Sequence, residues 1–349
     1  MTSVSESPPR AEVRRRHRGV TLAAGLLVLV AVLAFAVVLS IAVGARAVAP
    51  GAVFDALAHF DPANPDHVVV RDLRLPRTLT GLLAGVALGL AGAVIQGVTR
   101  NPLADPGILG VNAGAALFVV LGITAFGLTS VTGYVWLGFL GAAVAGTVVY
   151  AVGSLGRDGA TPVKLALAGA AVTAALASVT SGVLLTDTMT FDQFRFWQVG
   201  SLTGRDPAAV GQVLPFLAVG VVLALGSART LNTLSLGEDL ARALGQNVLL
   251  TRLLCALAVI VLCGSATAIA GPIGFVGLTV PHVARLITGP DHRWLLPYAA
   301  VLAPLLLLVA DVVGRVVLRP AELAVGIVTA VIGAPVFVVL VRRRKTVRL

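Results

Sequence analysis

Residues 19–45 read GVTLAAGLLVLVAVLAFAVVLSIAVGA, a run without a single charged side chain. A helix needs about 20 consecutive apolar residues to cross a bilayer core, and this run is longer. Arginines precede it, and small residues near Ala45 and Ala47 resemble a signal-peptide cleavage site. The apolar core of a signal peptide spans only about 7–15 residues. We therefore interpret this run as the first transmembrane helix and not as a cleaved leader.

Similar apolar runs fill the rest of the chain. Hydrophobic residues make up 57% of the 349 residues and charged residues 12%, about half the share that soluble domains carry. Much of the surface must therefore face lipid, which predicts an all-α polytopic membrane protein. About ten transmembrane helices are expected, near residues 20–44, 78–99, 107–126, 131–153, 163–186, 208–227, 249–270, 272–288, 294–313 and 322–341.

The distribution of charge predicts the orientation of these spans. Basic residues cluster before the first span and after the last, so the positive-inside rule places the N- and C-termini in the cytoplasm. Two ends on one side require an even number of spans, and ten satisfies this. Most of the 26 Lys and Arg residues then fall on the cytoplasmic side. Between residues 249 and 288 only Gly271-Pro272 interrupts the apolar run, so one long helix and two crossings both remain possible.

Composition also excludes several classes of protein. The net charge of +10 would suit nucleic acid, but the basic residues form no soluble domain, and we expect them to contact anionic membrane lipid. Cys255 and Cys263 lie eight residues apart in one apolar run, a separation that rules out a disulfide along a helix and favours small buried side chains. The sequence has no phosphate-binding loop, zinc-protease motif or nucleophile elbow. We expect neither an enzyme nor a metal or cofactor bound by this chain.

The chain divides into three predicted parts: a basic tail at 1–18, a permease domain at 19–341 and a basic tail at 342–349. On the side opposite the termini, residues 46–77 are expected to form a long polar loop. Residues 187–207 contain several aromatic side chains, which favours a short helix in the headgroup zone.

The second span carries a stripe of small residues at a spacing of four, formed by Gly81, Gly85 and Gly89. Such a stripe lets another helix approach closely, within this chain or across a dimer seam. Asp311, near the end of the ninth span, is the best candidate for an ion-coupling carboxylate. Arg315 follows four residues later and would pair with it on a helix, which argues against a transporter driven by an ion gradient.

A polar segment at residues 228–248 separates the sixth and seventh spans on the predicted cytoplasmic side. Three of its leucines recur every four residues, at Leu236, Leu240 and Leu244. This spacing predicts a short amphipathic helix with one apolar face. Glu238 and Arg242 share the spacing and can pair. Either a partner protein or lipid headgroups must cover the apolar face.

Three long motifs follow in order from about residue 70 onward. The first runs from LRLPRT at 73–78 to NPLADPGILG at 101–110, the second is LGEDLARALG at 236–245, and the third extends from GPIGFVGL at 271–278 to GAPVF at 333–337. Together they resemble the FecCD-type permeases of ABC importers, which carry ferric siderophores, haem or vitamin B12. One departure is Ala324, where the family usually has a proline, and its absence would change how the last helix begins.

The resemblance implies a bundle like that of the vitamin B12 importer permease, in the cytoplasmic membrane. It implies a second permease subunit, identical or different, two cytoplasmic ATPase subunits that bind ATP and Mg, and an extracytoplasmic substrate-binding protein. The expected cargo is a ferric siderophore or related metal chelate, moved by alternating access, with vitamin B12 or haem as alternatives.

The resemblance also assigns roles to residues. Contact with the ATPase would be made by Leu236, Gly237, Glu238, Leu240, Ala241, Arg242, Leu244 and Gly245. Acidic side chains of the binding protein would dock on Arg74, Arg77 and Arg315, for which headgroup anchoring and internal pairing are the alternatives. A cytoplasmic gate would be formed by Asn101, Leu103 and Thr161, for which an ordinary structural turn is the alternative.

Overall fold

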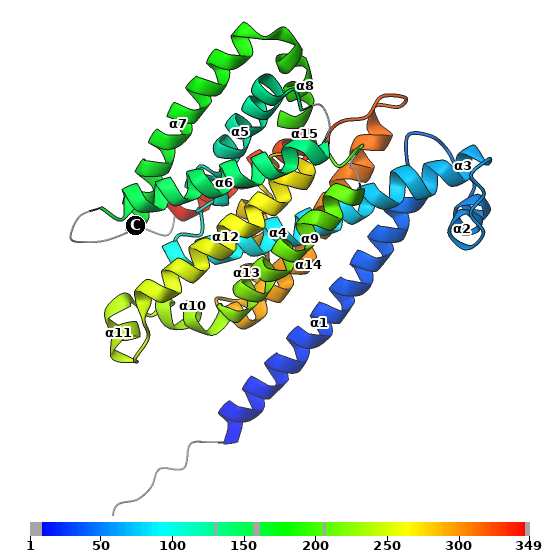
Figure 1. Ribbon diagram of the computed structural model, residues 1–349. Helices are drawn as coiled ribbons and strands as arrows, with labels where there is room; N and C mark the ends of the chain where they lie inside the picture. The colour runs from blue at the N-terminus through cyan, green and yellow to red at the C-terminus, as the bar shows by residue number, and fades with distance from the viewer. Residues whose placement is uncertain (1–8, 129–130, 156–160, 205–206, 346–349) are drawn as a thin grey trace, which may run out of the picture.

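The computed structural model describes residues 9–128, 131–155, 161–204 and 207–345, and every regular element in these ranges is a helix, as predicted (Figure 1). Ten helices overlap the ten predicted spans: α1 (Pro9–Ala42), α4 (Leu75–Thr99), α5 (Val111–Phe126), α6 (Val131–Gly153), α7 (Pro162–Thr186), α9 (Pro207–Gly226), α12 (Val248–Ala270), α13 (Val276–Thr288), α14 (His292–Val317) and α15 (Val325–Lys345). The connecting elements are α2 (Pro50–Ala58), α3 (Pro65–Val68), a π-helix (Val69–Arg74), a 3-10 helix (Pro106–Leu109), α8 (Thr188–Gln198), α10 (Ala228–Ser235) and α11 (Glu238–Ala243).

Not all ten helices are long enough to cross a bilayer. Seven helical segments of the described residues have the necessary length and apolar character. α13 has 13 residues, which is about 20 Å at 1.5 Å per residue, whereas a crossing needs about 30 Å. The run at 249–288 therefore does not form one long helix: α12 ends at Ala270 and α13 begins at Val276. The second of these helices is too short to cross the bilayer alone. The number of crossings stays a prediction.

The core of the bundle lies around α4, which packs against α12, α13 and α14 (Figure 1). In their most apolar windows, 78% of the residues of the segment containing α4 and 72% of those of α12 are buried, against 11% in α1. The sequence of α4 is rich in glycine and alanine, and these small side chains allow its neighbours to approach closely. α1 and α7 instead expose many leucine and valine side chains, as helices that face lipid do.

The segment at 46–77 is not the loop that was predicted. It contains α2 and α3, and each begins with a proline at its first helical position, where the missing N–H costs nothing. The side chain of Asn64 accepts a hydrogen bond of 3.0 Å from the amide of Asp66 and so caps α3. From Pro65 the chain stays helical to Thr99, so the helix of the second span starts well before residue 78.

The predicted short helix within 187–207 is present as α8, but its aromatic side chains do not all face outward. Phe194 and Trp197 are buried against each other, with ring centroids 5.6 Å apart. Phe191 is exposed. Two of these rings therefore belong to the packed interior, and the place of α8 in the headgroup zone stays a prediction.

The predicted tails are partly helical. Residues 9–18 belong to α1 and residues 342–345 to α15, while residues 1–8 and 346–349 lie outside the described ranges. α15 begins directly after Ala324, whose carbonyl accepts hydrogen bonds from the amides of Ile327 and Val328. The last helix therefore starts in a regular way without the family's proline.

Candidate functional site

Two polar regions lie at opposite ends of the bundle (Figure 1). One is the coupling segment, residues 228–248, which contains α10 and α11. The other is an arginine cluster beside α2 and α3, consisting of Arg74, Arg77, Asp311, Arg315 and Glu322. α4 and α14 run between them, because α4 begins and α14 ends in the cluster.

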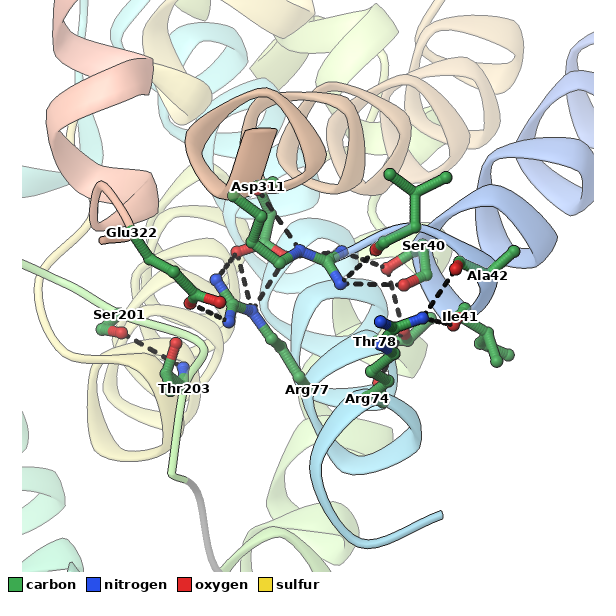
Figure 2. A network of polar contacts seen from close by, with 12 residues as sticks. Ser40, Ile41, Ala42, Arg74, Arg77, Thr78, Ser201, Thr203, Asp311 and Glu322 are labelled. Carbon is green, nitrogen blue, oxygen red and sulfur yellow. Dashed lines mark hydrogen bonds and ion pairs between the residues drawn. The ribbon is translucent and has the colours of Figure 1, made fainter. Parts of the chain in front are cut away.

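Asp311 is the centre of the arginine cluster. Its carboxylate is buried on α14 and accepts three hydrogen bonds of 2.8–3.0 Å from Arg77 of α4. On its other side, the guanidinium of Arg315 lies 2.9 Å from the carboxylate. The third nitrogen of the Arg77 guanidinium, Nη1, donates to Glu322, 2.5 Å away, and Figure 2 shows this acid and Asp311 on two sides of Arg77. One buried carboxylate is thus shared by two arginines, and the predicted Asp311–Arg315 pair is present.

The arginines also hold the end of α1. The last carbonyls of a helix have no partner within it, and those of α1 end inside the protein. Arg315 donates to the carbonyls of Ser40 and Val43 at 2.9 Å. Arg74 donates to those of Ile41 and Ala42 at 2.9 and 2.6 Å (Figure 2). Positive charge at the C-terminal end of a helix also complements its dipole, so the cluster fastens α1 to α4 and α14.

The cluster has an excess of positive charge. Three arginines face two carboxylates, which leaves +1, and the cluster opens onto a pocket of about 380 Å³ lined by Arg46, Arg74, Arg77 and Arg315 with Glu322 as its one acid. The exposed fractions of Arg74, Arg77 and Arg315 are 4%, 7% and 2%. Headgroup anchoring does not fit such burial. Internal pairing does, while docking on these arginines stays a prediction.

The coupling segment presents its apolar face to the outside. Leu236, Leu240 and Leu244 are 61%, 48% and 62% exposed. The helix that carries this face, α11, covers only residues 238–243, so the first leucine precedes it and the last follows it. Ala241 is buried on its opposite side. Gly237 and Gly245 have φ angles of +112° and +80°, which glycine adopts at little cost. The two glycines therefore allow the chain to turn at both ends of α11.

Glu238 anchors α11 to the bundle. It pairs with Arg242 at 3.2 Å, as its spacing predicts, and also with Arg252 at the start of α12 and with Arg100 at the end of α4, the latter at 3.6 Å. The sequence analysis missed Arg100 and Arg252. Arg100 directly follows the second predicted span, and Arg252 lies just inside the seventh, both on the predicted cytoplasmic side. This position at the end of a span is the signal that could have identified them.

The three predicted gate residues make local contacts. The side chain of Asn101 accepts a hydrogen bond of 3.0 Å from the amide of Leu103 and so forms a turn. Thr161 caps α7 by accepting from the amide of Lys164 at 3.3 Å. These contacts are those of structural turns. Arg100 precedes Asn101, so the turn is attached to the end of α4 that contacts Glu238.

The glycine stripe packs against α14 of the same chain. A Cβ atom added at Gly85 would lie 2.3 Å from Cα of Pro304, and one at Gly89 would lie 2.5 Å from the carbonyl oxygen of Ala299. A Cβ at Gly81 would meet Leu308 at 2.8 Å. The stripe therefore brings α4 and α14 into backbone contact and forms part of the interior. Among the described residues no group of three or more His, Cys, Asp or Glu side chains could hold a metal ion.

The chain is similar to several known proteins. The model of the FecCD transport family matches residues 32–343. The ferric enterobactin transport system permease of Escherichia coli K12 is 50% identical over 320 residues, 92% of this chain and 94% of that protein. The iron(3+)-hydroxamate import permease of Bacillus subtilis 168 is 41% identical, covering 88% and 80%. A solved metal-chelate type ABC transporter in an inward-facing conformation matches with a TM-score of 0.79 at 29% identity, covering 92% of this chain and 99% of that one.

Proposed function

The chain belongs to the FecCD transport family, and from this premise we propose that it is the permease of an ATP-driven importer for a ferric siderophore. The observation that carries the proposal is the 50% identity to a ferric enterobactin permease along nearly the whole chain. Ferric hydroxamate is named for another relative, so ferric siderophores are the favoured substrate class, ahead of vitamin B12 and haem. The chain itself performs no covalent chemistry.

Energy enters at the coupling segment. Three leucines that are 48–62% exposed form an apolar face that a cytoplasmic ATPase groove would cover, and burial of the exposed half of each side chain stabilises a complex by about 1 kcal/mol. Glu238 holds this face to the end of α4 through Arg100 and to α12 through Arg252. A movement of the ATPase would therefore reach several helices at once and switch the path between outward and inward access.

The loaded binding protein docks at the arginine cluster. The pocket there is lined by four arginines and one glutamate, and the cluster keeps an excess positive charge after its internal pairs are formed. An acidic side chain of a partner would therefore find complementary charge, which gives orientation and register to docking. The cluster lies at the end of the bundle opposite the coupling segment (Figure 1), as import from outside to inside requires.

The expected orientation follows from the charge pattern, and the remaining parts of the assembly follow from membership of the family. Ten spans with both termini in the cytoplasm place the coupling segment and the turn at Asn101 on the ATPase side. This turn, with Leu103 and Thr161, would close the path toward the cytoplasm. A second permease, identical or not, completes the path, two ATPase subunits bind ATP and Mg, and membrane lipid covers the exposed apolar faces of α1 and α7.

Transport driven by an ion gradient is the competing function. It would need a carboxylate in the membrane that can gain and lose a proton or bind an ion. Asp311 is the best candidate, but two arginines hold it in hydrogen bonds of 2.8–3.0 Å and an ion pair of 2.9 Å. A carboxylate so strongly paired is poorly suited to a relay, and this observation favours the ATP-driven reading.

Uptake into vesicles that contain this chain, its ATPase and its binding protein tests the proposal. Labelled ferric enterobactin, a ferric hydroxamate, haemin and cobalamin are compared, each with and without ATP on the ATPase side. We expect ATP-dependent accumulation of a ferric siderophore. Accumulation of cobalamin or haemin alone would contradict the substrate class, and equal uptake of all four would contradict selective transport.

The contribution of the leucine face is measured with two double variants. Leu240→Ala with Leu244→Ala is expected to weaken binding of the ATPase by about tenfold or more, because each truncation removes apolar contact area. Leu167→Ala with Leu185→Ala is the matched control, since these leucines of α7 are 67% and 86% exposed. Equal ATPase binding by the two double variants would contradict the role of the coupling segment.

A further inference from the structure

The coupling segment makes a second attachment to the bundle, at the start of α14. The side chain of Asn232, on α10, donates to the carboxylate of Asp291 at 2.6 Å. Its oxygen accepts from the backbone amide of His292 at 2.8 Å and from the ring nitrogen Nδ1 at 2.9 Å. One amide side chain therefore holds two consecutive residues at the beginning of α14, in a cluster that we name the clasp: Asn232, Asp291 and His292.

The clasp is more than a helix cap. Asp291 already caps α14, because its carboxylate accepts the amide of Arg293 at 2.9 Å. Burial acts to raise the pKa of Asp291, but the bonds from Arg293 and Asn232 together with nearby positive charge outweigh it and hold this pKa below its usual range. α14 can thus begin without Asn232. What the amide adds is a connection between α10 and α14, with His292 buried beneath it.

α14 leads from the clasp to the arginine cluster. It runs without interruption from His292 to Val317, and its last turns carry Asp311 and Arg315. Its length of 26 residues corresponds to about 39 Å. Along the way it touches the glycine stripe of α4 at backbone distance, and at its far end Arg77 of α4 binds Asp311. α4 and α14 therefore form a tightly packed pair.

Both helices of this pair are tied to the coupling segment. α4 reaches it through Arg100 and Glu238 at 3.6 Å, and α14 through the clasp. Close packing leaves little room for the two helices to slide past each other. A displacement of α10 and α11 would accordingly move both helices and shift the far end where the arginine cluster holds α1.

We propose that Asn232 is the positioning residue that makes α14 follow the coupling segment, so that the clasp passes movement at the ATPase side to the arginine cluster. This inference rests on the proposed function, since it presumes that an ATPase moves α10 and α11. It goes beyond that function by naming the helix and the side chain that carry the movement. Asn232 touches no substrate and acts only through α14.

A reciprocal exchange tests the clasp. Asn232→Asp places two carboxylates opposite each other, so the bond to residue 291 becomes a repulsion. Asn232→Asp with Asp291→Asn removes the repulsion, because the amide nitrogen at 291 can donate to the carboxylate at 232, which still accepts from His292, while the amide oxygen at 291 accepts from Arg293. For the full assembly in vesicles, we expect the substrate transported per ATP hydrolysed to fall about tenfold or more in the single variant and to return to within about twofold in the double variant.

The outcomes separate the two proposals. Wild-type transport per ATP in Asn232→Asp, or a double variant as defective as the single one, would overturn the role of the clasp. Failure of the wild-type assembly to show any ATP-dependent uptake would instead overturn the proposed function. If Asn232→Asp does not assemble, Asn232→Ala takes its place, since it removes the same bonds without adding charge.

A spin label on α14 provides a readout that a merely structural role would not change. Val313→Cys carries the label, because Val313 is 41% exposed while the natural Cys255 and Cys263 are 1% and 3% exposed. ATP is expected to change the spectrum of the label in the otherwise wild-type assembly and in the exchanged pair, but not in Asn232→Asp. An unchanged response in Asn232→Asp, or no response in an assembly that transports, would overturn the inference.

Discussion

Replacement of Asp311 by asparagine should destabilise the protein strongly. The carboxylate is fully buried and neutralises two guanidinium groups, those of Arg77 and Arg315, which are 7% and 2% exposed. Asparagine has nearly the same shape but no charge, so two buried cations would remain with Glu322 as their one nearby acid. Removal of one partner from a buried ion pair costs about 3–5 kcal/mol. At about 2 °C per kcal/mol for a large chain, the midpoint of thermal unfolding should fall by about 6–10 °C.

The assay heats the detergent-purified protein and follows its monodisperse peak in size-exclusion chromatography. The measured quantity is the temperature at which half of this peak is lost. Glu322→Gln is the matched control in the same cluster: it pairs with Arg77 too, but its side chain is 32% exposed. A partly exposed pair contributes about 1 kcal/mol or less, so this variant should lose at most about 2 °C. Comparison of the two variants shows whether the loss of stability comes from burial of the charge or from the loss of any acidic residue in the cluster.

A double variant isolates the electrostatic cause. Arg77→Gln with Asp311→Asn removes one positive and one negative charge, and it leaves Arg315 bonded to the carbonyls of α1. Because it leaves fewer uncompensated buried charges, it should be more stable than Asp311→Asn alone, contrary to simple addition of two defects. Wild-type stability of Asp311→Asn, or purely additive losses in the double variant, would refute this reasoning.

Two further predictions concern packing and topology. Gly85→Ala should prevent recovery of folded protein because its Cβ would lie 2.3 Å from Cα of Pro304, whereas Gly211→Ala, with nothing within 4 Å, should be neutral; equal yields and unfolding midpoints would contradict the close contact of α4 and α14. Cysteines introduced at Asp239 and Phe54, which are exposed, should react with an impermeant maleimide from the cytoplasmic and the outer side respectively, while the buried natural Cys255 and Cys263 stay unmodified without denaturant. Labelling of both introduced cysteines from one side would exclude the ten-span topology.

Local spacing predicted only part of the arginine cluster. The pair of Asp311 and Arg315 follows from a spacing of four on one helix. The bonds from Arg77 to Asp311 and from Arg315 to Ser40 join residues more than 200 positions apart, and no local pattern contains them. They depend on where α1 ends and on how closely α4 meets α14. The arginines were recognised as a group, but their burial was not.

In the coupling segment, too, local spacing predicted some of the contacts and missed others. The leucine spacing correctly predicted an apolar face that remains exposed, and the spacing of Glu238 and Arg242 predicted their pair. Arg100, Arg252 and the clasp come from distant helix ends that only the tertiary fold brings together. Between 46 and 77, in contrast, the signals were present: Pro50 and Pro65 each start a helix, and these prolines were not recognised as helix starts within a polar segment.

The most direct test of the account is the source of energy for uptake. Vesicles with the complete assembly are given ATP on the ATPase side while an uncoupler abolishes every ion gradient, and parallel vesicles receive a gradient without ATP. The account predicts accumulation of the ferric siderophore in the first case, none in the second, and none in the first when Leu240→Ala and Leu244→Ala are combined. Accumulation that follows the gradient and ignores ATP would contradict it and would make Asp311 the residue on which transport depends.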